Sequence, residues 1–207
     1  MIIAVDGPTA SGKGTIARGL AAHYGLPYLD TGLLYRAVGR QVFLDGGDPD
    51  EAGDALAGTA FPDALLEDPA LRSEETGGLA SRVSIHPSVR QALYERQRKF
   101  AEQPGGAVLD GRDIATVIAP DADVKLFVTA SVEARAERRW KEMRESGIEV
   151  SLDDIAQDIR ARDERDANRA EAPLRVAEGA FVIDNSAMTR EQALAAAIEA
   201  VEAARRG

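Results

Sequence analysis

One stretch near the N-terminus constrains the whole chain. Residues 7–15 read Gly-Pro-Thr-Ala-Ser-Gly-Lys-Gly-Thr and directly follow a short apolar run at residues 2–5. That run predicts a buried strand, and residues 16–21 continue as the first turns of a helix. Glycines, a lysine and a hydroxyl between a strand and a helix are the layout of a phosphate-binding loop. The glycines let successive N–H groups face an anion, while the lysine and the helix N-terminus add positive charge.

The loop departs from the usual pattern at one position. Gly14 separates Lys13 from Thr15, whereas the usual loop places the magnesium-binding hydroxyl directly after the lysine. The Lys-Gly-Thr ending resembles the nucleoside monophosphate kinases, in which the metal is held largely through water. The shifted hydroxyl argues against a direct bond from Thr15 to the metal, so Thr15 is a candidate for contact through water, and the sequence leaves open whether Thr15 or Asp110 touches Mg²⁺ directly. The candidates for nucleotide binding are all nine loop residues: Gly7, Pro8, Thr9, Ala10, Ser11, Gly12, Lys13, Gly14 and Thr15.

The composition limits the remaining possibilities. A chain of 207 residues with 44% hydrophobic residues can bury one substantial core, and without cysteine it has neither disulfides nor cysteine metal sites. A net charge of −10 argues against general nucleic-acid binding. Only four of the 25 basic residues are lysines, and the others are arginines, whose planar guanidinium groups can bind a small anion through two hydrogen bonds. A coding bias would give the same ratio of arginine to lysine. With no secretory signal and no long apolar run, we expect a soluble, cytoplasmic protein without a membrane partner, and we expect it to be a monomer.

Strands are expected at residues 2–5, 28–29, 107–109, 124–128 and 180–183, with helices between most of them. This order predicts an α/β fold of the P-loop NTPase type, with a five-stranded parallel sheet flanked by helices. We expect the core to comprise residues 1–44 and 104–207, with a short lid at about residues 139–162. Residues 45–103 form an insertion, which lacks a clear period up to Gly78 and is expected to be partly loop.

Helices are expected in the second half of the insertion, at residues 80–83 and 88–100. Val89, Leu93, Arg96 and Phe100 recur at helical spacing and predict the buried face of the second helix. Arg90 lies off that face, so a solvated charge is the simpler interpretation of it.

Charged and hydroxyl residues follow two of the expected strands. Asp30 and Thr31 come after the strand at 28–29, where they either only cap the next helix or also line a site together with Arg36. Arg112 and Asp113 follow the strand at 107–109, and Arg112 could simply pair with a neighbouring aspartate. The carboxyl ends of the strands are where ligands bind in open α/β sheets, which favours the site.

Two arginine-bearing helices are expected at residues 132–144 and from residue 152, separated by Gly147. The first carries three arginines on one face, at positions 135, 138 and 139. In the second, Arg162 could form i,i+4 pairs with Asp158 and Asp166, and solvated pairs of this kind would explain its charges. Two such helices joined by a glycine also describe a lid that closes over phosphates.

The chain resembles the bacterial cytidylate kinases nearly from end to end. The similarity lies in the loop and in four further runs, which are Leu-Asp-Thr-Gly-Leu-Leu-Tyr-Arg at 29–36, Ser-Val-Arg-Gln-Ala-Leu at 88–93 with Arg-Gln-Arg at 96–98, Asp-Gly-Arg-Asp at 110–113, and Arg-Asp-Glu-Arg-Asp-Ala-Asn-Arg-Ala at 162–170. The runs at 88–98 and 162–170 distinguish it from adenylate, guanylate and shikimate kinases. The resemblance implies transfer of the γ-phosphoryl group of ATP to CMP or dCMP, with Mg²⁺ as cofactor.

The resemblance also implies roles for single residues. Cytosine would be held by Ser81, Arg90 and Asp113, and the acceptor phosphate by Arg36 and Arg112. Asp30 would lie at the mouth of this acceptor site. Thr31, Asp166 and Arg169 would meet the pentose, Thr31 standing where the family usually has Ser. The catalytic cations would be Lys13, Arg135, Arg139 and Arg162. A small antiparallel sheet, present in the insertion of many members, is expected to be reduced here.

Two other functions would use the same phosphate-binding loop. A kinase for UMP or another small acceptor would share the loop and the arginines but not the base preference. A nucleotide-dependent switch is disfavoured, because none of the four lysines lies in a guanine-reading Asn/Thr-Lys-x-Asp run. Histidines 23 and 86 have no partner pattern that indicates catalysis or metal binding.

Overall fold

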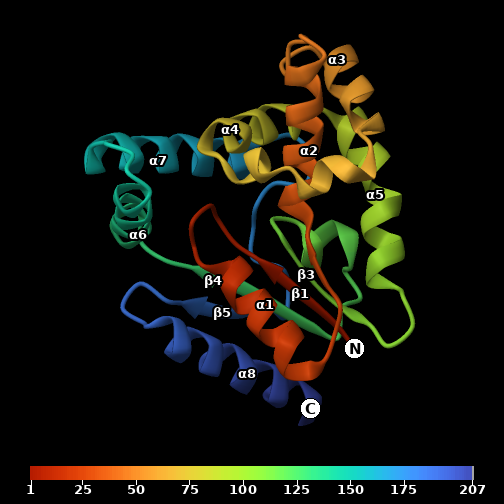
Figure 1. Cartoon of the computed structure of the whole chain (residues 1–207). Helices are drawn as coiled ribbons and strands as arrows, with labels where there is room; N and C mark the ends of the chain where they lie inside the picture. Colours follow the sequence, from red (N-terminus) through yellow and green to blue (C-terminus); the bar gives the residue numbers. More distant parts are fainter. Residues whose placement is uncertain (207) are drawn as a thin grey trace.

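The computed structural model describes residues 1–206 and is built around one parallel sheet (Figure 1). Its strands run in the order β2-β3-β1-β4-β5 and every neighbouring pair is parallel. The strands are β1 (Ile2–Asp6), β2 (Tyr28–Asp30), β3 (Ala107–Gly111), β4 (Val124–Thr129) and β5 (Phe181–Asp184). The expected five-stranded parallel sheet is therefore confirmed. Because β1 lies in the middle, the phosphate loop leaves the sheet at the centre of its carboxyl edge.

Helices cover both faces of the sheet (Figure 1). On one face, α1 (Lys13–Tyr24) and α8 (Arg190–Arg206) pack on the alternate strand residues Ile3 and Val5. On the other face, the end of α5 (Pro87–Ala101) and the short helical turn η4 (Ile114–Ile118) pack on Ala4 and Leu109. A strand buried on both faces needs an unbroken apolar sequence, which is what residues 2–5 supply.

Residues 45–103 are helical and share a separate apolar cluster with α2. After α2 (Thr31–Leu44) come α3 (Ala52–Ala57), three short 3₁₀ turns at Gly58–Ala60, Asp63–Glu67 and Pro69–Arg72, and α4 (Glu74–Val83). Leu34, Val38, Leu71, Val83 and Val89 are buried together between these helices and α5. Among the described residues 45–103 there is no strand. The stretch up to Gly78 showed no clear period because its helical pieces are too short to present a repeating face.

The buried face of α5 differs from the expected one. Val89 and Leu93 are buried as predicted, but Arg96 is exposed and Gln97 is buried in its place. Arg90, for which the helical pattern favoured a solvated charge and the family resemblance favoured a binding role, is also buried. The buried position expected for Arg96 and the solvated interpretation of Arg90 are therefore wrong, because a hydrophobic period does not detect polar partners from other elements, such as Asp113 for Arg90.

Two further helices extend over the carboxyl edge of the sheet (Figure 1). They are α6 (Val132–Glu145) and α7 (Leu152–Asn168), and the turn between them contains Gly147 with φ 75°. They pack through a small cluster that includes Ala136, Ile155 and Ile159. No helix within residues 1–206 is long and apolar enough to cross a membrane.

Candidate active site

The phosphate loop joins β1 to α1 and depends on two glycines. Gly12 caps α1 in the left-handed conformation, with φ 84°, which directs the first N–H groups of the helix into the loop. Gly7 lies so close to β4 that a Cβ atom there would meet the Val128 carbonyl oxygen at 2.0 Å. The Lys13 Nζ donates to the Pro8 carbonyl oxygen at 3.2 Å, so the lysine folds back across its own loop. An anion in this loop would meet backbone N–H groups and an ammonium together.

The electrostatic surroundings of Lys13 are unusual. Burial and, to a smaller extent, the nearby Arg112 guanidinium lower the pKa of Lys13 to about 8, while Asp110 and Asp30 act in the opposite direction. Burial disfavours the protonated form of this lysine, and a neighbouring anion favours it. A phosphate bound beside Lys13 would therefore stabilise the charged lysine and be bound strongly by it.

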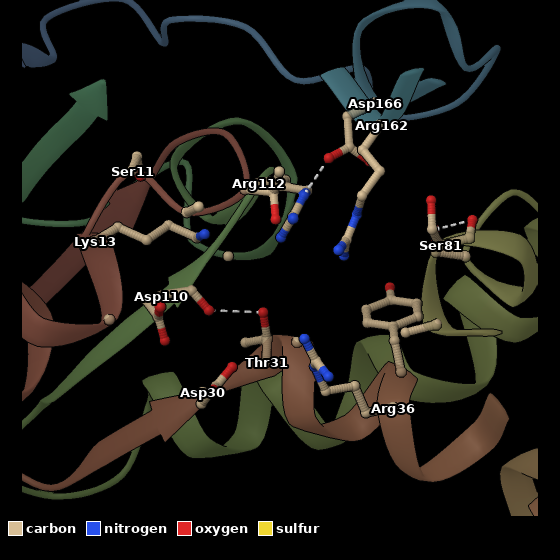
Figure 2. Close-up of a pocket in the computed structure, with 18 of the residues that line it drawn as sticks. Ser11, Lys13, Asp30, Thr31, Arg36, Ser81, Asp110, Arg112, Arg162 and Asp166 are labelled. Atoms are coloured by element: carbon tan, nitrogen blue, oxygen red, sulfur yellow. Dashed lines mark hydrogen bonds and ion pairs between the residues drawn. The ribbon is translucent and has the colours of Figure 1, made fainter. Parts of the chain in front are cut away.

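Beside the loop lies a cavity of about 310 Å³. Figure 2 shows Lys13, Arg36, Arg112 and Arg162 pointing toward a common space from four different elements. All ten residues expected at the acceptor site line it: Asp30, Thr31, Arg36, Ser81, Arg90, Arg112, Asp113, Arg162, Asp166 and Arg169. Loop residues 9–15 form its opposite wall. Residues spread over more than 150 positions of sequence thus share one cavity of nucleotide size.

The floor of the cavity is built where β2 meets α2. Asp30 caps α2 by accepting the Leu33 N–H at 3.2 Å, so it is a cap as well as a cavity residue. The buried Thr31 hydroxyl donates to the Asp110 carbonyl oxygen at 2.8 Å (Figure 2). This bond ties the start of α2 to β3. It also accounts for Gly111, where a Cβ would lie 2.5 Å from the Thr31 Oγ1.

Arg36 reaches the cavity from α2 and is held by the insertion. Its Nη1 donates to the carbonyl oxygens of Leu71 and Ser73, both at 2.8 Å. Burial lowers the pKa of Arg36, although Asp30 acts in the opposite direction. The guanidinium is therefore positioned by backbone carbonyls and keeps its net positive charge for a ligand.

The far end of the cavity contains a buried ion pair. Arg90 of α5 binds Asp113, which follows β3, and each residue is less than a tenth exposed. Arg169 lies 4.0 Å from the same aspartate, and its Nη2 is buried without a hydrogen-bond partner among residues 1–206. Burial lowers the pKa of Arg169, as does the neighbouring Arg90. A buried donor without a partner marks a place where a ligand oxygen would be bound.

Arg112 binds neither Asp110 nor Asp113. Its Nε pairs with Asp166 of α7, which links the edge of the sheet to the helix above it (Figure 2). The intrahelical pairs expected for Arg162 do not form within the described residues. Burial lowers the pKa of Arg162 to about 10, and the guanidiniums of Arg112 and Arg36 lower it further. Arg162 instead donates to the Gly77 carbonyl oxygen at 3.3 Å.

Three of the four arginines of α6, at positions 135, 138 and 139, point to different partners. Arg139 lines the cavity and pairs with Glu74 of α4, and burial lowers its pKa. Arg138 donates to the side chain and the backbone carbonyl of Asn185, at 2.9 and 2.6 Å. Arg135 does not line the cavity. It is buried beneath the loop, where it donates to the Thr9 carbonyl oxygen at 3.1 Å and pairs with Asp163 at 2.6 Å. Arg135 thus connects the loop to α7.

A second cavity, of about 440 Å³, lies on the other side of the loop. It shares Ala10, Gly12, Thr15 and Arg139 with the first cavity, so both open onto the phosphate loop. Its other lining residues come from α6 and from the segment that leads into α8. Among them Asn185 donates to the Ser11 carbonyl oxygen at 2.8 Å and so ties this wall to the loop. If each cavity held one nucleotide, the phosphates of the two nucleotides would meet at the phosphate loop.

A model of the cytidylate kinase family matches residues 3–203. The chain belongs to the cytidylate kinase family. It is 56% identical to a cytidylate kinase of Xanthobacter autotrophicus over the full length of both chains. It is 54% identical to one from a Caulobacter species over 205 residues, covering 99% of this chain and 95% of the other. Among solved structures, an uncharacterised protein from Eubacterium ventriosum covers 98% of each chain at a TM-score of 0.55 and 16% identity, which shows a similar fold.

The cytidylate kinase fold offers one place suited to Mg²⁺. The Asp110 carboxylate lies against the start of α1, where its Oδ2 would be 3.3 Å from a Cβ at Gly14. Its Oδ1 accepts the Tyr28 hydroxyl at 2.9 Å. Burial raises the pKa of Asp110 to about 6, and the nearby Asp30 raises it further. A divalent cation would relieve that repulsion, and Mg²⁺ usually takes one or two carboxylates, with phosphates and water as its other ligands. The exposed Thr15 hydroxyl lies at the same end of the loop, so these residues fit the ion.

Sequence reasoning missed three groups of residues. Asp6 is buried next to the loop and accepts two backbone N–H groups from η4. Arg165 contacts Ser81. The third group is the wall of the second cavity near Asn185. The position of Asp184 and Asn185 after β5, at the carboxyl edge of the sheet, was the available signal for that wall.

Proposed function

We propose that this protein is an ATP-dependent cytidylate kinase that converts CMP or dCMP to CDP or dCDP in pyrimidine nucleotide metabolism. The observation that carries the proposal is the pair of cavities that meet at the phosphate loop, with the acceptor cavity lined by convergent cations. Membership of the family supports the same activity. The proposal covers both CMP and dCMP, and the ratio of their kcat/KM values measures which of the two is preferred.

The donor is assigned to the second cavity and the loop. In this proposal, the nucleoside of ATP lies between α6 and the start of α8, and its phosphates cross the loop at residues 7–15. Loop N–H groups and Lys13 would bind the β- and γ-phosphates. Arg135 would act beneath the loop, since its contacts to Thr9 and Asp163 hold the loop and α7 in register.

The acceptor is assigned to the first cavity, with its phosphate toward the loop. Arg36 and Arg112 would bind that phosphate, since both lie on the loop side of the cavity (Figure 2). Ser81, Arg90 and Asp113 would bind cytosine. The buried pair of Arg90 and Asp113 presents both donors and acceptors, which suits a base with both kinds of group on its edge. The pentose would be contacted by Thr31, Asp166 and Arg169.

The chemistry follows from the charges. An oxygen of the CMP phosphate attacks the γ-phosphorus of ATP, a new O–P bond forms, and the bond from the γ-phosphorus to the β-bridging oxygen breaks, so that ADP leaves with the electron pair. The attacking oxygen is already ionised, so no general base is required. Lys13, Arg139 and Arg162 would stabilise the negative charge that gathers at the transferring group. Mg²⁺, when bound near Asp110 and Thr15, supplies further positive charge at the donor phosphates.

Water has to be excluded from this reaction, because it would otherwise accept the phosphoryl group. We assign this task to the lid, at about residues 139–162, which covers the carboxyl edge of the sheet together with the insertion at 45–103. Residues 1–44 and 104–207 would then be the core. One chain supplies the residues assigned to both substrates, which favours a monomer as the active form. The charged substrates favour a cytoplasmic location.

The test is an assay of ADP release with ATP and each of CMP, dCMP, UMP, AMP and GMP. Higher kcat/KM for the cytosine nucleotides than for the others is the expected result. Equal kcat/KM for all five acceptors would refute the substrate assignment. A kinase for UMP is the second candidate. It would be favoured if Arg90→Ala left the base preference unchanged, because the contact with cytosine would then have no role.

A further inference from the structure

Two arginines of α7 reach α4 at matching positions. Arg162 donates from Nη2 to the Gly77 carbonyl oxygen at 3.3 Å, and Arg165 donates from Nε to the Ser81 hydroxyl at 3.2 Å. Gly77 and Ser81 are four residues apart on α4, while the two arginines are three residues apart on α7. Residues at these spacings share one face of a helix, so the two bonds are successive links between the same pair of faces.

The two links end at different parts of the acceptor cavity. Arg162 lines the cavity and points toward the phosphate side in Figure 2, whereas Ser81 lies at the opposite side of the same cavity. Arg165 itself does not line the cavity and touches it only through Ser81. It is the one arginine of the run at 162–170 to which no role has been given.

We propose that Arg165 is a positioning residue for base recognition, which fixes the orientation of the Ser81 hydroxyl and thereby sharpens the preference for cytosine. This inference rests on the proposed function, because it concerns the base that Ser81 would bind. It predicts an effect on acceptor selectivity and not on phosphoryl transfer.

The physical reason is the hydrogen-bonding capacity of a hydroxyl. A serine hydroxyl has one hydrogen to donate and two lone pairs, and a guanidinium can only donate. When Arg165 occupies one lone pair, the hydroxyl keeps its hydrogen and its other lone pair for the cavity, in a fixed direction. Without Arg165, the hydroxyl of a buried serine could rotate among its staggered positions.

The backbone around Ser81 is already fixed by other contacts. Its carbonyl oxygen accepts the Ser84 hydroxyl at 3.0 Å (Figure 2), and Ser81 is only 8% exposed. The hydroxyl direction is therefore the main freedom left at this position. A hydroxyl of fixed direction discriminates between cytosine, which carries an amino donor at C4, and uracil, which carries a carbonyl acceptor there.

The experiment compares Arg165→Met with wild type, with CMP and UMP as acceptors at saturating ATP. Methionine keeps the aliphatic stem and removes the donor. We expect KM for CMP to rise by about tenfold, kcat for CMP to stay within about twofold, and the ratio of kcat/KM for CMP to that for UMP to fall by about tenfold. Arg165→Lys, which retains a donor, should restore part of the ratio.

Arg160→Met is the matched control. Arg160 lies on the same helix and is exposed, as Arg165 is, but it pairs with Glu133 of α6 at 3.5 Å and makes no contact with Ser81. Its replacement should change neither KM nor selectivity. Ser81→Ala and its combination with Arg165→Met complete a double-mutant cycle. The double variant should be no less selective than Ser81→Ala alone, because Arg165 is proposed to act through that hydroxyl.

Two results would overturn the inference. One is an equal fall in kcat for CMP and UMP in Arg165→Met, which would mean that Arg165 acts on closure of α7 over α4. The other is additive losses in the double variant, which would mean that Arg165 does not act through Ser81. The wild-type measurement tests the proposed function separately: a wild-type protein that does not prefer CMP refutes that function, and with it this inference.

Discussion

The Asp6 carboxylate accepts the backbone N–H of Ile114 at 2.8 Å, across the carboxyl edge of the sheet. Its second oxygen accepts the N–H of Ala115, also at 2.8 Å. Asp6 is the last residue of β1 before the phosphate loop, and Ile114 follows directly on Asp113. These bonds therefore fix the position of the phosphate loop relative to the proposed acceptor residues. Burial raises the pKa of Asp6 to about 7, although the two N–H groups act in the opposite direction.

We expect Asp6→Asn to weaken CMP binding by about tenfold, because the amide keeps one acceptor and turns an NH₂ group toward the second N–H. The loss of a buried charge offsets part of the lost hydrogen bonding, so Tm should change by only a few degrees. Calorimetric titration with CMP and a thermal melt measure the two effects.

Asp123→Asn is the control for Asp6→Asn. The Asp123 Oδ2 accepts the Ile2 N–H at 2.6 Å, at the other end of the same strand and far from the cavity. This change should lower Tm and leave the affinity for CMP unaltered. If Asp6→Asn also lowered only Tm, Asp6 would have a purely structural role.

The reaction should lose efficiency at alkaline pH because of Lys13. Its pKa of about 8 in the free protein means that the ammonium loses its proton as the pH rises through that value. The positive charge on the donor side is then lost, so kcat/KM for ATP should fall above about pH 8. A profile for kcat/KM that stays level to pH 10 would contradict this expectation.

Replacement of Lys13 separates chemistry from binding. Lys13→Ala should lower kcat by about 10²–10³-fold, as expected for loss of one charged group at the transferring phosphate. The affinity for CMP should hardly change, since Arg36 and Arg112 remain. A matching loss of CMP affinity and of Tm would instead indicate a disturbed fold.

The sheet could be predicted from the sequence because its signals are local. The run at residues 2–5, the glycine loop and the strand at 124–128 each need only a few neighbouring residues to be recognised. Arg90 shows why other parts could not. Its partner Asp113 is 23 residues away, and only the folded chain reveals that the pair is buried. A charged residue off an apolar face is usually solvated, and that rule fails where a second element supplies the opposite charge.

The candidate acceptor residues were found through short motifs, but their contacts were not. For Arg112 the sequence offered Asp110 or Asp113 as simple partners, but the side chain pairs with Asp166, 54 residues away. Asp6 gave no signal, because one acidic residue at the end of a strand is compatible with many roles. Long-range pairing decides such contacts, and a single sequence does not contain it.

The buried pair of Arg90 and Asp113 allows stability to be separated from base recognition. Arg90→Met or Asp113→Leu alone should lower the free energy of unfolding by about 3–5 kcal/mol, because each leaves a buried charge without its closest partner. The double variant should regain part of that stability, since two apolar side chains replace the pair while Arg169 loses its neighbouring aspartate. It should still fail to discriminate CMP from UMP. Denaturant unfolding and the acceptor assay test both expectations, and a double variant that still prefers CMP would remove this pair from base recognition.

Gly7 offers the most direct test of the phosphate loop. A methyl group there would lie 2.0 Å from the Val128 carbonyl oxygen, and with φ 157° the backbone conformation is one that L side chains rarely adopt. Either β4 or the loop must move, so Gly7→Ala should abolish measurable ATP binding and lower Tm. Gly53→Ala is the control, since a Cβ at that position of α3 meets nothing within 4 Å. It should stabilise the fold by about 0.5–1 kcal/mol through helix propensity and leave ATP affinity intact. ATP binding of wild-type strength in Gly7→Ala would show that the triphosphate does not lie in this loop, and the proposed donor site would then be wrong.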